Sequence, residues 1–91
     1  LPQDQGISGL LNEVCRARPD LVFLDVHLRH LNGIEVMRGL RDEMDLQNLR
    51  VLMTSGMDVG SQCRQAGADD FILKPFMPDD LLIKIRSLLG N

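Results

Sequence analysis

The chain has 91 residues, a length that accommodates one hydrophobic core and excludes a two-domain protein. Apolar residues make up 44% and charged residues 25%, which is typical of a globular domain and not of a disordered chain. The net charge is −3, and the ten basic residues are scattered among thirteen acids, so the sequence predicts no direct contact with nucleic acid.

Neither a membrane span nor a secretion signal is visible in the sequence. The apolar runs are far shorter than the roughly 20 residues that cross a bilayer, and no signal peptide opens the chain. Cys15 and Cys63 lack the spacing of a disulfide framework or a zinc ribbon, so both are predicted to be free thiols. These features predict a cytoplasmic protein without a membrane partner.

The first regular element is predicted before Pro19. Residues 1–6 are rich in Pro, Gly, Asp and Gln and are expected to form a loop. Apolar residues then recur at helical spacing, at Leu10, Leu11, Val14 and Ala17. The helix must end near Arg18, because the proline ring displaces the preceding residue from the helical region.

Two segments read as strands buried on both faces of a parallel sheet, because their apolar residues run on without alternation. The first covers residues 21–24 and ends at Asp25, and the second covers residues 51–53 and ends at Thr54. Between them, residues 26–33 are expected to form a polar loop and residues 45–50 a linker. A helix separates the two, with an inner stripe predicted at Ile34, Met37, Leu40 and Met44.

The last third of the chain repeats the helix and strand order. A short helix over residues 61–66 is predicted to end at Gly67, and a third strand over residues 71–73 ends at Lys74. A final helix covers residues 79–89, with Pro78 in its first turn. Alternating helices and strands predict an α/β fold with three layers around an open parallel sheet.

Three chemically active side chains follow the three predicted strands. Ligands of open parallel sheets bind beyond the carboxyl ends of the strands, where Asp25, Thr54 and Lys74 are expected. A carboxylate can attack phosphorus, a hydroxyl can bind a phosphoryl oxygen and an ammonium can neutralise its charge. The sequence therefore predicts capture of a phosphoryl group.

These segments resemble the receiver domain of two-component response regulators, a flavodoxin-like fold. The stretch 19–25 is similar to the third strand of that family, 51–55 to its fourth strand, and 66–76 to its fifth strand with the following Lys-Pro. The resemblance implies that Asp25 is the phosphoacceptor, that Thr54 and Phe71 are switch residues, and that Lys74 is the charge partner. It also implies a cis peptide bond before Pro75.

The sequence departs from the family at its N-terminal side. The family has two further strands and a helix before the strand of residues 21–24, and an acidic pair there binds magnesium with the phosphoacceptor. We find neither in this sequence, so residues 1–91 are expected to be a single, N-terminally incomplete receiver domain. Asp25 and the backbone carbonyl of His27 are then the implied ligands for Mg²⁺, with weak or absent binding. Arg29 stands where the family usually has proline.

The resemblance implies a regulatory module and not a metabolic enzyme. A sensor histidine kinase or a phosphotransfer protein is the implied partner, and phosphorylation of Asp25 would change a partner surface. The bare edge of the strand at residues 21–24 also predicts a possible homodimer.

Two other functions fit part of the pattern. A phosphohydrolase of the haloacid-dehalogenase type also uses an aspartate, a threonine or serine, and a lysine, but it needs a second aspartate at the position of His27. A receiver-like interaction module that is never phosphorylated would fit the missing acidic pair. The pair His27 and His30 lacks a third metal ligand, which favours solvated side chains. Asp69 and Asp70 are expected to form a solvated turn, and pairing with basic residues of the last helix, such as Arg86, is the alternative.

Overall fold

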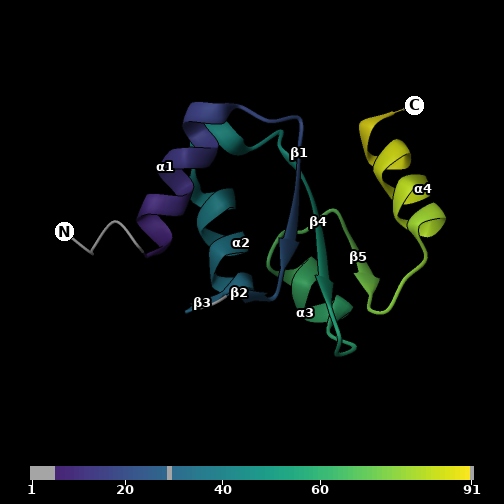
Figure 1. Cartoon of the computed structure of the whole chain (residues 1–91). Helices are drawn as coiled ribbons and strands as arrows, with labels where there is room; N and C mark the ends of the chain where they lie inside the picture. Colours follow the sequence, from purple (N-terminus) through teal and green to yellow (C-terminus); the bar gives the residue numbers. More distant parts are fainter. Residues whose placement is uncertain (1–5, 29, 91) are drawn as a thin grey trace.

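A computed structural model describes residues 6–28 and 30–90. The expected loop at residues 1–5 and the expectation for Arg29 therefore lie outside the described residues. Four helices and three main strands alternate along the chain (Figure 1). They are α1 (Ile7–Ala17), β1 (Leu21–Asp25), α2 (Gly33–Asp42), β4 (Arg50–Ser55), α3 (Gly60–Gln65), β5 (Asp70–Leu73) and α4 (Pro78–Leu89).

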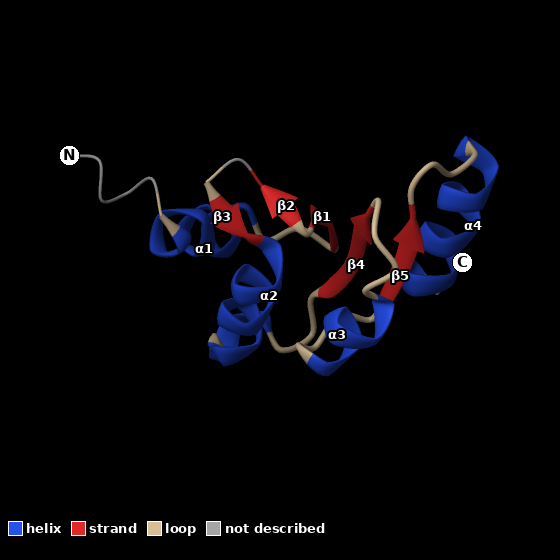
Figure 2. Ribbon diagram, turned by 90° about the horizontal axis from the view of Figure 1, so that it is seen from below, coloured by secondary structure: helices blue, strands red, loops and turns tan. Residues whose placement is uncertain are grey.

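The three main strands form one parallel sheet in the order β1-β4-β5. The helices α2 and α3 lie on one side of this sheet and α4 lies on the other (Figure 2). The fold therefore confirms the predicted three-layer α/β architecture. Because neighbouring strands follow chain order, Asp25 pairs in register with Thr54, and Thr54 with Ile72.

The main core lies between the sheet and the helices α2 and α3. Side chains at alternate strand positions point into it, as the two-residue period of a strand requires. The cluster includes Leu24, Val51, Met53 and Phe71 from the strands and Val36, Met37, Leu40 and Cys63 from the helices. Burial raises the pKa of the Cys63 thiol, so this cysteine behaves as an apolar core residue.

The ends of α1 and α3 agree with the sequence signals. α1 ends before Arg18, which adopts the left-handed conformation with φ 48° immediately before Pro19. α3 is followed by Gly67 with φ 114°, where a Cβ atom would also lie 2.5 Å from Cγ of Arg41. Glycine is therefore required at residue 67 both by the backbone and by the space available.

Two expectations about the region around α2 were wrong. Residues 26–33 are not all loop, because β2 (His27–Leu28) and β3 (Leu31–Asn32) form a short antiparallel pair. Met44 does not belong to the inner stripe of α2 and is 87% exposed. The helix ends at Asp42, Glu43 is extended, and Met44 begins the 3₁₀ helix η2 (Met44–Leu46). Leu46 takes the buried position instead.

The outer edge of β1 has no partner strand among the described residues, because β1 pairs only with β4. Phe23 on this strand is 42% exposed, and its ring meets the Phe76 ring edge-on at 6.0 Å. An apolar strand with an open edge is a template for pairing with another chain. We therefore expect this edge to be covered by the same chain, by an exchanged segment or by a second copy.

We predict that the polypeptide of residues 1–91 self-associates through this edge. Sedimentation velocity should show dimers or larger species at micromolar concentration. Phe23→Lys should shift the population toward monomer, since a charged side chain on an edge strand disfavours pairing with another chain. Met44→Lys is the matched control, because Met44 is exposed at a different part of the surface. A stable monomer of the unchanged chain would contradict the prediction.

No helix within residues 6–28 and 30–90 is both long and apolar enough to cross a membrane.

Candidate functional site

Asp25 ends β1 at the carboxyl edge of the sheet, where its carboxylate is held by two donors. The Lys74 ammonium forms an ion pair with Oδ2. The backbone N–H of His27 donates to Oδ1 at 2.8 Å. The hydrogen bond from Lys74 and then that from His27 lower the pKa of Asp25 below its ordinary value of 3.8. The carboxylate is therefore ionised at neutral pH.

Lys74 is brought to Asp25 by the end of β5. Its backbone N–H donates to the Ser55 carbonyl at 2.9 Å, which continues the ladder between β4 and β5 by one residue. The Lys74–Pro75 peptide bond is cis, as the resemblance implies. The lysine thus spans two strands to reach the carboxylate, because β4 lies between β1 and β5.

Thr54 lies beside Asp25 in the sheet, but its hydroxyl is directed elsewhere. The Thr54 Oγ1 donates to the Ile72 carbonyl at 2.7 Å, and the residue is buried. The structure therefore brings Asp25 and Lys74 into contact. Thr54 lies at the same edge of the sheet, but its hydroxyl is hydrogen-bonded to β5.

Phe71 precedes Ile72 on β5 and is buried against α3. The contact is close: a Cβ atom built on Gly60 would lie 3.1 Å from Cδ2 of the Phe71 ring. The carbonyl that accepts the Thr54 hydroxyl thus belongs to the residue that follows Phe71 in β5.

We predict that Lys74→Gln raises the pKa of Asp25 toward its ordinary value, because the ammonium that stabilises the carboxylate is lost. Since the folded-state pKa of Asp25 is depressed, the pair stabilises the fold above the unfolded pKa of about 4. That stabilisation is lost as the pH falls through the folded-state pKa. A carbon-13 titration of the Asp25 carboxyl group measures the change. Arg38→Gln, which alters a cation paired with Glu35, should leave this titration unchanged.

The two histidines after Asp25 are both exposed, as predicted. Within residues 6–28 and 30–90, no group of three or more His, Cys, Asp or Glu side chains could hold a metal ion. The site offers one carboxylate, from Asp25, and Mg²⁺ usually needs one or two carboxylates together with phosphate oxygens. These residues therefore do not complete a magnesium site by themselves.

The expectation that Asp69 and Asp70 are solvated was wrong. Asp69 pairs with Arg41 at 2.8 Å and accepts the Val51 backbone N–H. Asp70 pairs with Arg64 at 2.9 Å and with Lys84 at 3.0 Å. The alternative expectation, pairing with a basic residue of the last helix, is confirmed for Asp70, although that residue is Lys84 and not Arg86.

Charge balance explains how Asp70 stays ionised. Burial raises the pKa of Asp70, but the Phe71 backbone N–H, Lys84 and Arg64 outweigh this effect and hold the pKa below its ordinary value. These pairs tie α3 and α4 to β5. Arg64 precedes Asp70 by six residues and Lys84 follows it by 14, so neither pair has the spacing of neighbours within one helix or strand.

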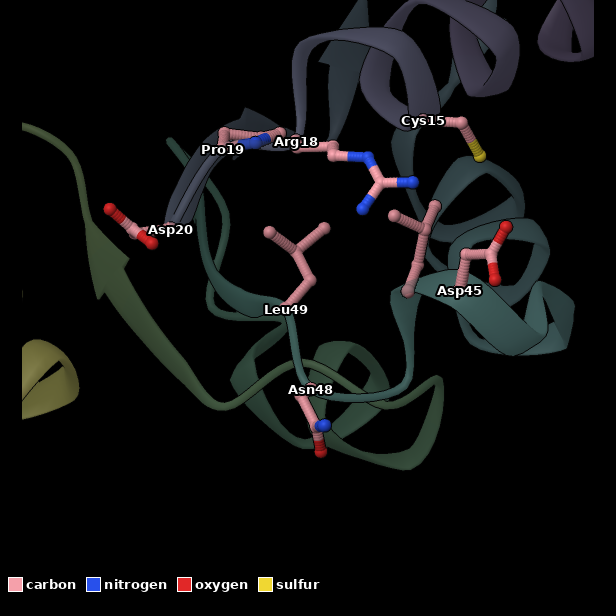
Figure 3. A pocket seen from close by; sticks show the side chains of 8 residues that line it. Cys15, Arg18, Pro19, Asp20, Asp45, Asn48 and Leu49 are labelled. Carbon is pink, nitrogen blue, oxygen red and sulfur yellow. The ribbon is translucent and has the colours of Figure 1, made fainter.

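A pocket of about 250 Å³ lies at the opposite end of the sheet from Asp25. Arg18 and Cys15 line one side, and Leu49 points back toward Arg18 from the loop before β4 (Figure 3). Asp20 and Asp45 contribute acids beside the single arginine, so the lining has no uniform charge. No motif in the sequence predicts a site at this amino-terminal end of the strands.

The fold and the site residues define a small α/β domain in which an ionised aspartate pairs with a lysine at the carboxyl ends of the strands. The comparison with protein families is more specific, because the model of the response regulator receiver domain matches residues 5–86. The chain therefore belongs to the family of response regulator receiver domains, the signalling modules of two-component systems.

Relatives of known identity are response regulators. Response regulator MprA of Mycobacterium leprae is 43% identical over 89 residues, which cover 94% of this chain and 38% of that protein. DNA-binding response regulator MtrA of Mycolicibacterium smegmatis is 38% identical, with 90% of this chain and 36% of that protein covered. The chain thus spans less than two fifths of the length of these relatives.

Solved structures agree on the fold. The receiver domain of NtrX from Brucella abortus has a TM-score of 0.81 and 26% identity, covering 94% of this chain and 74% of that one. The receiver domain of the Francisella response regulator 1452 has a TM-score of 0.80 and 25% identity, covering 93% and 71%. A receiver domain of a Pseudomonas aeruginosa sensor histidine kinase, solved with magnesium in its active-site cleft, has a TM-score of 0.80. Its 21% identity shows the common fold alone.

Proposed function

We propose that Asp25 is the phosphoacceptor of this receiver domain and that a histidine kinase or a phosphotransfer protein is the donor. The observation that carries the proposal is the ionised Asp25 carboxylate paired with Lys74 at the carboxyl edge of the sheet. An ionised carboxylate is the nucleophilic form, and this edge is where ligands reach an open parallel sheet.

The transfer is a substitution at phosphorus. A carboxylate oxygen of Asp25 attacks the phosphorus of a phosphohistidine, a P–O bond forms, and the P–N bond to the imidazole breaks. The product is an acyl phosphate on Asp25, and the imidazole leaves with the electron pair of the broken bond. Lys74 then stabilises the added phosphoryl charge in place of the carboxylate charge it neutralises before transfer.

Thr54 supplies the switch in this proposal. Its hydroxyl leaves the Ile72 carbonyl and donates to a phosphoryl oxygen on Asp25. Because Ile72 adjoins Phe71, release of this bond loosens the part of β5 that packs against α3. The partner surface formed by these elements changes as a result.

Magnesium has a limited place in this scheme. Asp25 and the backbone carbonyl of His27 are the residues of this chain that we propose as its ligands. With one carboxylate, the ion depends on phosphoryl oxygens and on further ligands, so we expect weak binding to residues 1–91 alone.

Residues 1–91 are proposed to be a single, partial receiver domain with a regulatory role. DNA binding is a property named for MtrA, of which this chain covers 36%. With a net charge of −3 and dispersed basic residues, this domain is not proposed to contact nucleic acid itself.

The proposal is tested by incubating the full chain with acetyl phosphate and magnesium and measuring its intact mass. Addition of one phosphoryl group that hydroxylamine removes supports an acyl phosphate on a carboxylate. Steady turnover of a phosphate monoester would favour a hydrolase instead, and neither reaction would favour a binding module. His27, where the hydrolase needs an aspartate, argues against the second function.

A further inference from the structure

Val26, the residue that follows Asp25, is held through both of its backbone polar groups. The Val26 N–H donates to the Thr54 carbonyl at 2.9 Å, so β4 fixes this residue on one side. The Val26 carbonyl accepts the Gly33 N–H at 2.7 Å, so the start of α2 fixes it on the other. Val26 itself is buried in the core. The backbone next to the acceptor is therefore joined both to the sheet and to α2.

Gly33 approaches this backbone more closely than any other residue type could. A Cβ atom on Gly33 would lie 2.3 Å from the Asp25 carbonyl oxygen and 2.6 Å from Cα of Val26. Both atoms belong to the backbone, so neither can rotate away as a flexible side chain does. A single methyl group at residue 33 must therefore displace the end of β1, the start of α2, or both.

Asn32 completes the link from α2 to the carboxylate. Its side chain caps the helix by accepting the Ile34 N–H at 2.8 Å and the Glu35 N–H at 3.4 Å. Its backbone pairs with His27 across the β2–β3 bridge, and the His27 N–H in turn donates to Oδ1 of Asp25. Gly33 thus contacts the backbone around Asp25, and Asn32 pairs with His27, the residue that binds one carboxylate oxygen of Asp25.

We propose that Gly33 is a positioning residue for phosphoryl capture, and that the junction of β3 and α2 at Asn32 and Gly33 fixes the Asp25 carboxylate in its orientation toward Lys74. This inference rests on the proposed role of Asp25 as the acceptor. In-line attack on phosphorus requires the attacking oxygen to be held in place, and a displacement of about 1 Å costs up to about 100-fold in rate. The lack of a side chain at residue 33 is therefore required for phosphoryl transfer to Asp25 as well as for packing.

The test compares two glycines of the same helix in the full chain. Gly33→Ala should slow phosphorylation of the chain by acetyl phosphate by about 10- to 100-fold. Gly39→Ala is the matched control, because the nearest atoms to its Cβ would be side-chain methyl groups of Leu11, at 3.1 Å, and Ile7, at 3.6 Å, and no backbone atom. Rates are measured well below the unfolding temperature of each variant. The His27 amide resonance, which reports the bond to Asp25, should move in Gly33→Ala and stay in place in Gly39→Ala.

A second pair of variants keeps the test decisive if Gly33→Ala does not fold. Asn32→Ala removes the cap and should slow phosphorylation about three- to tenfold, whereas Asn32→Ser keeps an acceptor oxygen and should restore the rate. The inference is overturned if folded Gly33→Ala reacts as fast as Gly39→Ala, or if both Asn32 variants match the unchanged chain. If the unchanged chain takes up no phosphate, the proposed function fails by itself, and the His27 resonance still tests the geometry.

Discussion

Asp25→Asn is expected to abolish phosphate uptake from acetyl phosphate. The amide lacks the anionic oxygen that attacks phosphorus, and no second carboxylate among the described residues is paired with Lys74. The fold should survive, because an Asn side chain retains an oxygen that can accept the His27 N–H and can also bind the Lys74 ammonium. Intact mass after incubation with magnesium and acetyl phosphate measures the loss.

The matched control is Asp20→Asn, because Asp20 immediately precedes β1 and Asp25 ends it. Asp20 is exposed and lies at the amino-terminal side of β1, away from Lys74. This variant should take up one phosphoryl group at the rate of the unchanged chain. Equal uptake by Asp25→Asn would mean that another side chain is the acceptor, and it would remove the basis of the proposed function.

The sequence predicted the order of the main elements, because each carries its own local signal. Pro19 ends α1, Gly67 follows α3, and uninterrupted apolar runs mark the three strands. The edge that bears Asp25 and Lys74 followed from strand direction alone. Met44 was misplaced because helical periodicity continues past Asp42 in the sequence, while the chain turns there into η2.

Contacts between distant residues could not be predicted in this way. The bond from the Thr54 hydroxyl to the Ile72 carbonyl depends on which of two strands the side chain faces. The pairing of Asp69 depends on Arg41, 28 positions away, and on a loop that no periodic pattern describes. Such contacts become visible only when the packing of the elements is known.

Replacing Arg41 with alanine is expected to cause the largest loss of stability among single changes outside the core. The guanidinium donates to the carbonyl oxygens of Gly67, at 2.9 Å, Leu46, at 3.2 Å, and Leu49, at 2.8 Å. It also pairs with Asp69 at 2.8 Å, and Arg41 and Asp69 side chains are 21% and 29% exposed. One side chain thus joins α2, the η2 loop and the turn before β5.

Its removal leaves the Asp69 carboxylate and three carbonyl groups without this donor. Partly buried acceptors that lose a charged donor cost about 1–3 kcal/mol each at most, and water can replace part of the loss here. We therefore expect Arg41→Ala to lower the free energy of unfolding by about 2–3 kcal/mol. For a domain of this size that corresponds to a fall in melting temperature of about 10 °C or more. Urea unfolding followed by circular dichroism measures the change.

Arg38→Ala provides the matched control on the same helix. Arg38 pairs with Glu35 at 2.9 Å, but both side chains are more than half exposed, so this pair should contribute about 0.5 kcal/mol or less. Arg41→Lys should fall between the two, because an ammonium cannot reproduce the planar fork that reaches acceptors on several sides. If Arg41→Ala were no more destabilising than Arg38→Ala, the guanidinium contacts would be replaceable by water, and the three segments around Arg41 would be held by apolar packing alone.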